Sequence, residues 1–422
     1  MAREKIIVGI DVGSSKVATL IATSSDDSLT VIGVSSLPSK GIRKGQVVDI
    51  DEAVSSIAES LEAAERMAGV SVSSCFVSVG GAHISSVNSR GVVAVAGGEN
   101  EISEDDVRRV VEAAQAISVP SSREIIHVIP RDYIVDSQEG VKDPVGMTGV
   151  RLEVETHVIT GAATAMRNLV KCIQQVGIDV EGLVFSGIAA AEAVLTDTEK
   201  ELGVALIDIG GGATDVALFV DGSIAHSAVI PIGGRNITND LAIGLRSSLE
   251  TAEKIKLALS EKGRQVEGGS EKEKKKEETF DTSGLEISED LGTLSRKTLV
   301  EGIIKPRLTE IFTLVGMEIK RAGFAGLLPA GLVITGGAAS TALLSQVGKD
   351  VLRMPVRAAD PKGVSGLIDE ISTPAYSTAV GLLLYGEKMS VSASRATVSL
   401  ARGKNLVDLI RKLVSRLRGL LP

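Results

Sequence analysis

Two stretches of the chain repeat one order of apolar and polar positions. In each, an apolar run ends in an aspartate, glycines or other small residues follow, and a second apolar run begins. The first stretch covers residues 6–20 around Asp11, and the second covers residues 203–220 around Asp208. Short apolar runs bounded by glycines predict buried strands, so each stretch predicts two strands joined by a tight turn.

Each predicted turn has the chemistry of a phosphate-binding loop. Glycine backbone lets a phosphate approach closely and presents N–H groups to it. An aspartate that ends a buried strand is placed to hold water around Mg²⁺, which binds through few carboxylates. One such hairpin alone is also compatible with an ordinary structural turn. Two of them half a chain apart favour a duplicated domain whose halves grip a nucleotide between them.

The remaining pattern alternates helices and strands, which predicts an α/β protein. Two of the expected helices, 186–195 and 373–385, consist largely of small residues, and we expect them to pack closely across a hinge between large domains. An ordinary buried helix explains the first of them equally well. The other helices are expected at 51–68, 104–117, 163–176, 236–242, 248–259 and 299–322, and the other strands at 29–36, 75–79, 84–95, 125–130, 132–135, 154–159, 180–185, 224–232 and 332–334.

A smaller α+β unit is expected from about residue 82 to residue 160. It contains no phosphate turn, no cluster of acids and no Ser/His/Asp group. We therefore expect it to be a contact surface and not a catalytic one.

Composition limits the class of protein. A chain of 422 residues is long enough for two to four domains, and its cores must be built from Ala, Val, Ile and Leu because aromatic residues make up 2%. The net charge of −9 argues against bulk nucleic-acid binding. Two distant cysteines indicate a reducing compartment, and four scattered histidines predict no zinc site. We expect neither a signal peptide nor a spanning helix.

Three polar or glycine-rich features extend the expected site. Lys16 follows the first turn and is a candidate partner for the β- or γ-phosphate, or else a solvated lysine at a hairpin edge. Glu253 and Lys256 share a helix face and are candidates to bracket the ribose or adenine, or else form a surface ion pair. Gly336 and Gly337 follow a strand, and we expect a helix N-terminus directly after them, which favours anions.

The C-terminal end has its own pattern. Residues 386–402 read as a flexible linker, and residues 403–422 as an amphipathic helix with a basic face. A basic amphipathic helix is typical of a segment that lies in an anionic membrane surface, although a helix docked on the protein's own core or on a partner is the alternative. The expected membrane-binding residues are Leu406, Leu409, Ile410, Arg411, Lys412, Leu413, Val414, Arg416, Leu417, Arg418 and Leu420. The charged segment 263–278 is expected to be a surface loop.

Together these motifs resemble the nucleotide signature of the actin/Hsp70/sugar-kinase superfamily. More narrowly, the chain resembles the FtsA family of bacterial cell-division proteins from residue 5 to its end. The narrow resemblance lies in the inserted segment, in 127–133 (HVIPRDY), 138–140 (QEG), 144–146 (PVG) and 149–151 (GVR), and in 375–382 (AYSTAVGL) of the last helix.

The resemblance implies an actin-like two-lobed ATPase fold with a small inserted α+β subdomain and a C-terminal amphipathic helix. The implied divisions are subdomain 1A at 1–82, 163–196 and 356–385, the inserted subdomain 1C at 83–162, subdomain 2A at 197–233 and 301–355, subdomain 2B at 234–300 with the charged loop 263–278, the linker 386–402 and the membrane-targeting helix 403–422.

The resemblance also implies a site for ATP and Mg²⁺. The metal would be held through water by Asp11 and Asp208. The implied nucleotide-binding residues are Asp11, Gly13, Ser14, Ser15 and Lys16 in the first loop, Asp208, Gly210, Gly211, Gly212 and Thr214 in the second, and Glu253, Lys256, Gly336, Gly337 and Ala338 around the nucleoside.

The chain departs from filament-forming relatives where hydrolysis is concerned. Some of them place an acid just before the first small-residue helix, and here that position is Ser186. Asp208 and Asp215 remain as polar candidates for catalysis, which implies weak or absent ATPase activity.

By resemblance, the protein binds ATP, polymerises with itself and tethers FtsZ to the cytoplasmic face of the inner membrane at the division site. Its inserted subdomain would recruit downstream division proteins, and no nucleic acid is involved. A pilus-assembly-type actin-like adaptor is the closest alternative. A small-molecule kinase of the same superfamily is a further one, but the catalytic acid and sugar pocket that it needs are not visible.

Overall fold

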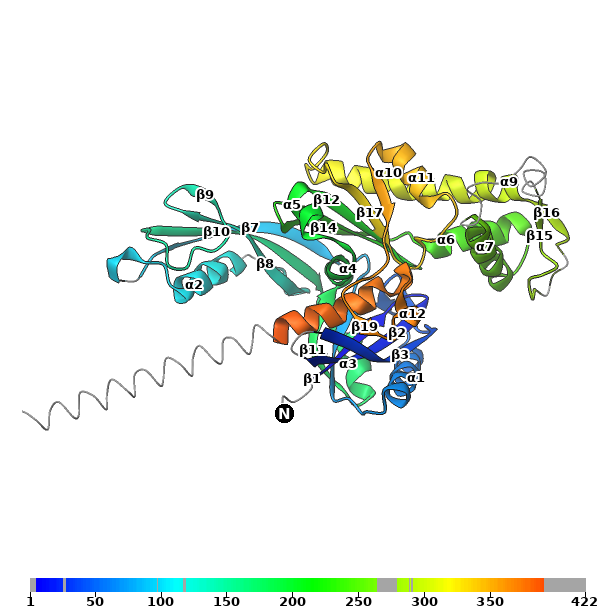
Figure 1. The fold of residues 1–422 in the computed structure, drawn as a ribbon, viewed down its shortest axis with the longest axis horizontal. Coiled ribbons are helices and arrows are strands. Elements are labelled where there is room, and N and C mark those ends of the chain that lie inside the picture. The colour runs from blue at the N-terminus through cyan, green and yellow to red at the C-terminus, as the bar shows by residue number, and fades with distance from the viewer. Residues whose placement is uncertain are drawn as a thin grey trace, which may run out of the picture.

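Two lobes, each built on one β-sheet, lie against each other, and a smaller domain projects to one side (Figure 1). The computed structural model describes residues 5–25, 28–96, 98–116, 119–263, 279–287, 289 and 291–390. The predicted tail helix at 403–422 and almost all of the charged segment 263–278 lie outside the described residues.

The first lobe is organised around the predicted N-terminal hairpin. Its sheet has the order β11-β6-β1-β2-β3-β19, in which β1, β2 and β3 form an antiparallel meander and β6 lies parallel to β1 on the other side. The strands are β1 (Lys5–Val12), β2 (Lys16–Ser25), β3 (Ser28–Pro38), β6 (Ser74–Val79), β11 (Asp179–Phe185) and β19 (Ser365–Gly366), with a small separate pair, β4 (Ile42–Arg43) and β5 (Gln46–Val47).

The second lobe repeats that arrangement around the second predicted hairpin. Its sheet has the order β14-β13-β12-β17-β18, again an antiparallel meander followed by strands parallel to the hairpin's first strand. The predicted duplication is thus confirmed in the strand order. The strands are β12 (Val204–Ile209), β13 (Thr214–Val220), β14 (Ser223–Ile230), β17 (Gly331–Thr335) and β18 (Val356–Ala358).

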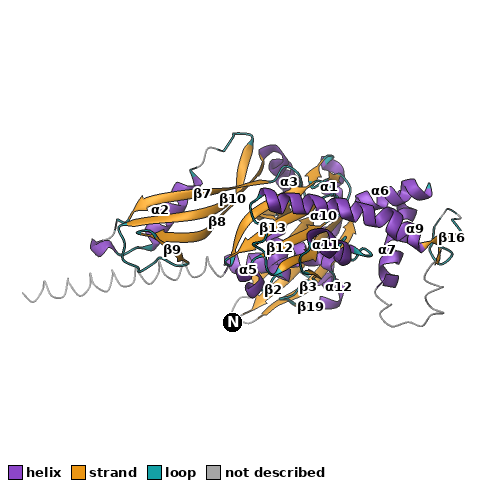
Figure 2. Ribbon diagram, turned by 90° about the horizontal axis from the view of Figure 1, so that it is seen from above, coloured by secondary structure: helices purple, strands orange, loops and turns teal. Residues whose placement is uncertain are grey.

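Amphipathic helices cover the two sheets, and a helical region extends from the second lobe on the side away from the projecting domain (Figures 1 and 2). The long helix expected at 299–322 is α9, η2 and α10 in succession, with one π-helical turn in η2. The helices are α1 (Ile50–Ala68) and α3 (Ala163–Gln175) in the first lobe, α5 (Asp197–Leu202), α10 (Lys305–Arg321) and α11 (Leu344–Leu352) in the second, α6 (Gly234–Leu245), α7 (Leu249–Gly263), α9 (Arg296–Leu299) and η2 (Val300–Ile304) in the helical region, and the short α12 (Ile368–Ile371) and η3 (Pro374–Tyr376).

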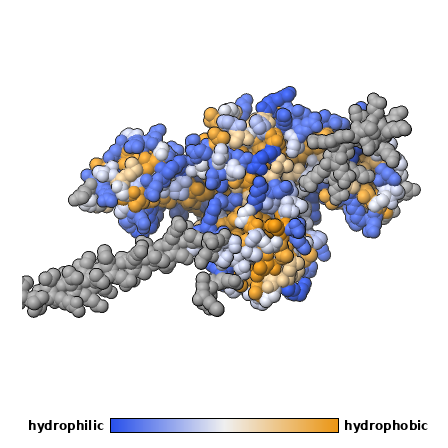
Figure 3. All heavy atoms as spheres, viewed as in Figure 1, coloured by the Kyte–Doolittle hydropathy of each residue, from blue (hydrophilic) through white to orange (hydrophobic). Residues whose placement is uncertain are grey.

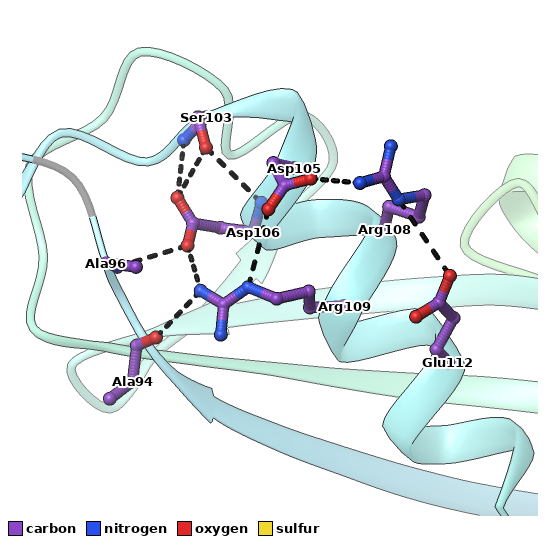
Figure 4. A network of polar contacts seen from close by, with 8 residues as sticks. All are labelled: Ala94, Ala96, Ser103, Asp105, Asp106, Arg108, Arg109 and Glu112. Carbon is purple, nitrogen blue, oxygen red and sulfur yellow. Dashed lines mark hydrogen bonds and ion pairs between the residues drawn. The ribbon is translucent and has the colours of Figure 1, made fainter.

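The projecting domain is the predicted insertion. Its sheet has the order β7-β10-β8-β9, and α2 (Glu104–Gln115) covers one face. Ser103 caps α2: its hydroxyl accepts a hydrogen bond from the Asp106 amide at 3.3 Å. The Ser103 amide in turn donates to the Asp106 carboxylate at 3.0 Å, and Asp106 also pairs with Arg109 (Figure 4). The strands are β7 (Ser85–Ala94), β8 (Arg123–Val135), β9 (Gln138–Val141) and β10 (Arg151–Ala162), and η1 (Gly98–Asn100) precedes α2.

Side chains of the insertion bond to the free edge of the second lobe's sheet. The Ser86 hydroxyl donates to the Ser227 carbonyl at 2.7 Å and accepts from the Ser227 amide at 3.2 Å. Two positions along β7, the Asn88 amide donates to the Ala225 carbonyl at 3.2 Å. Buried His157 joins the two groups, with ring nitrogens 2.7 Å from Asn88 Oδ1 and 2.9 Å from Ser227 Oγ. The insertion therefore contacts the second lobe although it interrupts the first lobe in sequence.

Two helices of small residues join the lobes, as the sequence predicts. They are α4 (Ser186–Val194) and the helix of residues 377–390. A Cβ at Gly381 would stand 1.7 Å from the Ala189 carbonyl oxygen, so the helices touch backbone to backbone. Residues of the second sheet, among them Leu206 and Val333, belong to the same apolar cluster as the first lobe and α4. The lobes thus share part of one core.

The structure corrects several expected boundaries. The strands expected at 125–130 and 132–135 are one strand, β8, because Pro130 lies at a bulge opposite Thr156, where a missing N–H is tolerated. The last helix continues through Ser390, past the linker start expected at 386. Strand β18 pairs with β17, so residues 356–358 belong to the second lobe's sheet and not to the first lobe.

Two expectations around the second lobe also change. The helix expected directly after Gly336 and Gly337 begins only at Leu344, because turns occupy the residues between. A two-stranded hairpin, β15 (Thr279–Asp281) and β16 (Thr293–Ser295), follows the charged segment. Sequence reasoning had expected no strands in this part of the chain.

Apolar side chains also reach the surface of the first lobe, the lower one in Figure 3. Those of Ile6, Ile368 and Met389 are 38–50% exposed. Scattered exposed apolar residues are usual on folded proteins, so we assign no ligand to them. Within the described residues, no helix combines the length and hydropathy needed to cross a bilayer.

The helix contact at Gly381 predicts that a glycine-to-alanine substitution there lowers the stability of the protein, whereas the same substitution inside a helix usually raises it. Replacing a glycine inside a helix by alanine normally stabilises the protein by ~1 kcal/mol. Gly381→Ala should instead lower the free energy of unfolding by about 2–4 kcal/mol, because the new Cβ overpacks a backbone contact between the lobes. Thermal and urea unfolding measure the change. Gly302→Ala is the matched control, since its Cβ would meet nothing closer than 3.9 Å; equal behaviour of the two variants would contradict the prediction.

Candidate functional site

The two glycine hairpins face each other across a cavity of about 900 Å³ between the lobes. Nearly all of the site residues predicted from the sequence line it. They are Asp11, Gly13, Ser14, Ser15, Lys16, Asp208, Gly210, Gly211, Gly212, Asp215, Glu253, Lys256, Gly336, Gly337 and Ala338.

The two turns have the same internal geometry. The Gly13 amide donates to the Lys16 carbonyl at 3.0 Å, and the Gly210 amide donates to the Ala213 carbonyl at 3.0 Å. The turns also come close to each other, because a Cβ at Gly211 would stand 1.9 Å from Ser15 Oγ. A side chain at position 211 would therefore collide with Ser15 unless that serine moved, so the two lobes meet here with glycine backbone against a short side chain.

Two aspartates, one from each lobe, are held by hydroxyl groups. Ser78 Oγ donates to Asp11 Oδ1 at 2.7 Å, and Thr378 Oγ1 donates to Asp208 Oδ2 at 2.8 Å. Ser78 comes from β6, and Thr378 comes from the start of the last helix. Each carboxylate keeps a second oxygen for a ligand.

Burial perturbs all three carboxyl groups of the cavity. Desolvation raises the pKa of Asp11 above its usual range, and desolvation together with the Asp11 charge raises the pKa of Asp208 to about 6. The pKa of Asp215 is raised well above its usual range by burial and by the two neighbouring carboxylates. A bound cation would relieve both causes, because opposite charge favours the ionised forms.

Lys16 enters the cavity and is not a solvated residue of a hairpin edge. Its ammonium group lies 3.7 Å from the centre of the Tyr376 ring, a cation–π contact. Burial lowers the pKa of Lys16, and the charges of Asp11 and Asp208 oppose that shift. The lysine is placed to meet an anion between the two turns.

The pair on α7 lies at the end of the cavity formed by the helical region. Lys256 Nζ donates to Glu253 Oε2 at 2.7 Å and to Thr238 Oγ1 at 3.0 Å. The two residues do form an ion pair, but Lys256 is only 7% exposed while 42% of the Glu253 side chain is exposed, so the pair is half-buried in the wall of the cavity. Both residues line the cavity together with Gly337 and Ala338 of the second lobe.

One predicted ligand residue does not face the cavity. Thr214 is fully buried, and its hydroxyl donates to the Ile232 carbonyl at 2.7 Å. It therefore bonds the second hairpin to the segment after β14, on the side away from the cavity. The sequence placed it correctly at the hairpin but could not show that the strand turns this side chain inward.

Ser186 and Asp215 converge at the end of the cavity beside Gly80. We call this end, where the phosphates of a nucleotide are expected, the phosphate end. A Cβ at Gly80 would stand 3.0 Å from Ser186 Oγ and 3.6 Å from both Asp215 carboxylate oxygens. Asp215 Oδ1 is buried and has no hydrogen-bond partner in the structure. A buried oxygen without a partner is costly, so a ligand, ion or water is expected to meet it.

Sequence reasoning missed several residues of the site. Ser78 and Thr378 carry no motif of their own, because they act through Asp11 and Asp208. A signal was present for the turn at Gly233 and Gly234, a glycine pair after a strand. The Gly234 amide donates to the Gly210 carbonyl at 2.9 Å and so braces the second hairpin.

The residues present fit a magnesium–nucleotide complex. Facing carboxylates with raised pKa values suit a divalent cation that keeps its waters. Bare glycine turns and Lys16 suit phosphates, and an unpartnered Asp215 oxygen remains beside them. Within the described residues, no group of three or more His, Cys, Asp or Glu side chains is arranged to hold a metal ion.

Comparison with known families gives two matches. The model described as "SHS2 domain inserted in FTSA" matches residues 81–160, which is the projecting domain. The model described as "Cell division protein FtsA" matches residues 205–381.

Individual proteins agree with these matches. The chain is 42% identical over 401 residues to the cell division protein FtsA of Pseudomonas aeruginosa, covering 94% of each chain. Among solved structures, it is similar to a chain of the PilM-PilN type IV pilus biogenesis complex, with a TM-score of 0.62, 15% identity, and coverage of 90% of this chain and 98% of that one. It is also similar to MreB 5 of Spiroplasma citri bound to AMPPNP, with a TM-score of 0.55, 12% identity, and coverage of 93% and 99%. The two lobes therefore have the actin-like fold, and the chain belongs to the FtsA family of cell-division proteins.

Proposed function

We propose that this division protein binds ATP with Mg²⁺ in the cavity between its lobes. The observation that carries the proposal is the pair of glycine hairpins, each with its aspartate, that face each other from the two lobes. The MreB 5 structure bound to AMPPNP supports it by analogy of fold.

Asp11 and Asp208 would hold the cation through its water shell. Ser78 and Thr378 orient them before binding, so little rearrangement is needed. A bound Mg²⁺ supplies positive charge that screens the phosphates. Lys16 adds a second positive charge from the first lobe.

Glu253 and Lys256 would contact the nucleoside from the second lobe. Lys256 is held in place by Glu253 and Thr238. Because 42% of the Glu253 side chain is still exposed, its carboxylate would accept a hydrogen bond from a ribose hydroxyl. The backbone of Gly336, Gly337 and Ala338 gives the flat surface that a base needs.

Turnover is expected to be slow. Ser186 stands where filament-forming relatives of the superfamily place an acid, and a hydroxyl is a weak general base. Asp215 is the nearby carboxylate, close to Ser186 across Gly80, and is the candidate to orient water.

The cellular role that we propose is to tether FtsZ to the cytoplasmic face of the inner membrane at the division site. The amphipathic pattern of residues 403–422 supports the membrane contact. One such tail binds weakly, whereas a polymer that presents many tails binds firmly through effective concentration. Self-association would thus switch membrane attachment, and the inserted domain would recruit later division proteins.

A pilus-type adaptor is the second candidate, supported by the similarity in fold to a chain of the PilM-PilN complex. The identity to that chain is 15%, against 42% to the FtsA of Pseudomonas aeruginosa. Family membership therefore favours the division role.

Asp208→Asn should stabilise the nucleotide-free protein. Asp208 has a pKa of about 6 in the folded protein against 3.8 unfolded, so its ionised form costs stability above pH 6. The variant should gain about 1–3 kcal/mol at pH 7.5. The gain should shrink as the pH falls through 6 towards 4, where wild-type Asp208 is protonated in both states. Thermal unfolding between pH 4 and 8 tests this.

The same variant should lose the rise in melting temperature that Mg·ATP gives the wild type. Asp240→Asn is the control, because Asp240 pairs with Arg307 at 2.6 Å and its loss should destabilise the protein. An Asp208→Asn protein that is less stable without ligand and still stabilised by Mg·ATP would contradict the assignment.

Asp215→Asn should separate binding from turnover. We expect ATP hydrolysis to fall about 100- to 10,000-fold, since a positioned base typically contributes that much. Affinity for Mg·ATP should stay within threefold, measured by titration calorimetry. Unchanged hydrolysis would remove Asp215 from the reaction.

Liposome flotation tests the tail. The full chain with ATP should float with vesicles that contain anionic lipid, and a chain ending at Arg402 should stay at the bottom of the gradient. Neutral vesicles should recover less full-length protein, because the basic face loses its attraction. Equal flotation of the two proteins would remove the membrane anchor from the proposal.

A further inference from the structure

We propose that His127 of the inserted domain is a positioning residue that fixes the start of α4 and thereby holds Ser186 at the phosphate end of the cavity. The proposal rests on the proposed nucleotide-binding function and assigns a role to a histidine far from the cavity in sequence. It makes the inserted domain part of the nucleotide site's support.

The contact is a buried hydrogen bond between the insertion and the first lobe. His127 lies on β8 and is 8% exposed, and its Nε2 accepts from the Phe185 amide at 3.0 Å. Accepting at Nε2 requires that the ring proton sit on Nδ1. Burial lowers the pKa of His127 to about 4, so the neutral ring is present at physiological pH.

Phe185 is the residue where strand β11 becomes helix α4. It occupies the N-cap position, and no side chain caps the helix there. Its ring is fully buried, and a Cβ at Gly187 would stand 2.7 Å from it. His127 is thus the side chain that anchors this junction by hydrogen bonding, and the next residue is Ser186.

A shift at Phe185 would reach the phosphate end within one residue. Ser186 lines the cavity, and its Oγ lies beside Gly80 and Asp215. Gly80 and Gly81 also line the cavity and lead directly into the insertion. The insertion is therefore linked to this end of the site in two ways. Its chain begins directly after Gly80 and Gly81, and its His127 bonds to Phe185, the residue before Ser186.

The ring of His127 also touches the second helix between the lobes. Its centre lies 5.9 Å from that of Tyr385 in an edge-on contact, and Tyr385 packs in the same way on Phe76 at 6.0 Å. Tyr385 belongs to the helix that begins near Thr378, the residue that holds Asp208. His127 thus lies where the insertion, α4 and this helix meet.

The root of the insertion is also bonded to the second lobe, through Ser86, Asn88 and His157. Ser86 and His127 both pair with Ile159 of β10, so the bonds to the second lobe and the bond to Phe185 lie at the same level of the sheet. Movement of one lobe against the other must therefore strain these bonds or move His127, which couples the lobe arrangement to the position of Ser186. A partner that turned the insertion would act on the same contact.

The test compares His127→Ala with His127→Gln, whose side-chain oxygen can still accept from the Phe185 amide. His226→Ala is the matched control, because it removes a histidine bond to Glu318 of 2.8 Å in the second lobe. Hydrogen exchange of residues 183–190 is measured without nucleotide, and the affinities for Mg·ATP and Mg·ADP are measured by calorimetry.

We expect His127→Ala to speed exchange in 183–190 at least tenfold and to weaken ATP about five- to tenfold, with ADP changed less than twofold. We expect this contrast because the proposal places the γ-phosphate beside Ser186 and Asp215, where ADP has no phosphate. His127→Gln should recover most of both effects, and His226→Ala should show neither.

Unchanged exchange in His127→Ala, or equal loss of ATP and ADP, would overturn the role of His127. Wild-type protein that binds neither nucleotide would instead overturn the proposed function, so the two failures are distinguishable. If His127→Ala does not fold, ¹⁵N-histidine spectra of the wild type decide, since a proton on Nε2 of His127 at pH 7 would overturn the proposal.

Discussion

Carboxylates from both lobes are buried in one cavity, and this is the constraint on which the arrangement of the lobes depends. Asp11 comes from the first lobe, and Asp208 and Asp215 come from the second; burial and mutual repulsion raise the pKa of Asp208 and Asp215, and burial raises that of Asp11. Lys16 offsets part of that cost. Ionising all three carboxyl groups in this cavity is therefore opposed by burial and by their mutual repulsion, and a positive charge between them would offset that cost.

The lobes are joined closely behind the cavity. Small residues bring α4 and the last helix into backbone contact at Gly381 and Ala189, so the lobes meet there without long side chains. Part of the second sheet shares a core with the first lobe, which fixes this contact. The inserted domain bridges both lobes through contacts at its root.

Much of this architecture could be predicted from the sequence, because it depends on patterns of apolar, glycine and small residues within short segments. The two Asp-Gly turns predicted the duplicated hairpins, and the small-residue helices predicted the close pairing at Gly381. Contacts between distant segments could not be predicted in the same way. Ser78 and Thr378 have no signature beyond their partners, Thr214 sits in the right motif but faces inward, and Pro130 misled the strand assignment because a bulge accommodates it.

The bonds of Ser86 to the second lobe also affect how two copies of the chain can associate. The Ser86 hydroxyl donates to the Ser227 carbonyl and accepts from the Ser227 amide, as the backbone of a neighbouring strand would. The Asn88 side chain donates to the Ala225 carbonyl, the next one that points outward from this edge. An open sheet margin invites uncontrolled joining of one molecule to the next, and here that margin is occupied at Ala225 and Ser227. Strand pairing between copies of the chain at this margin is therefore blocked by two short polar side chains.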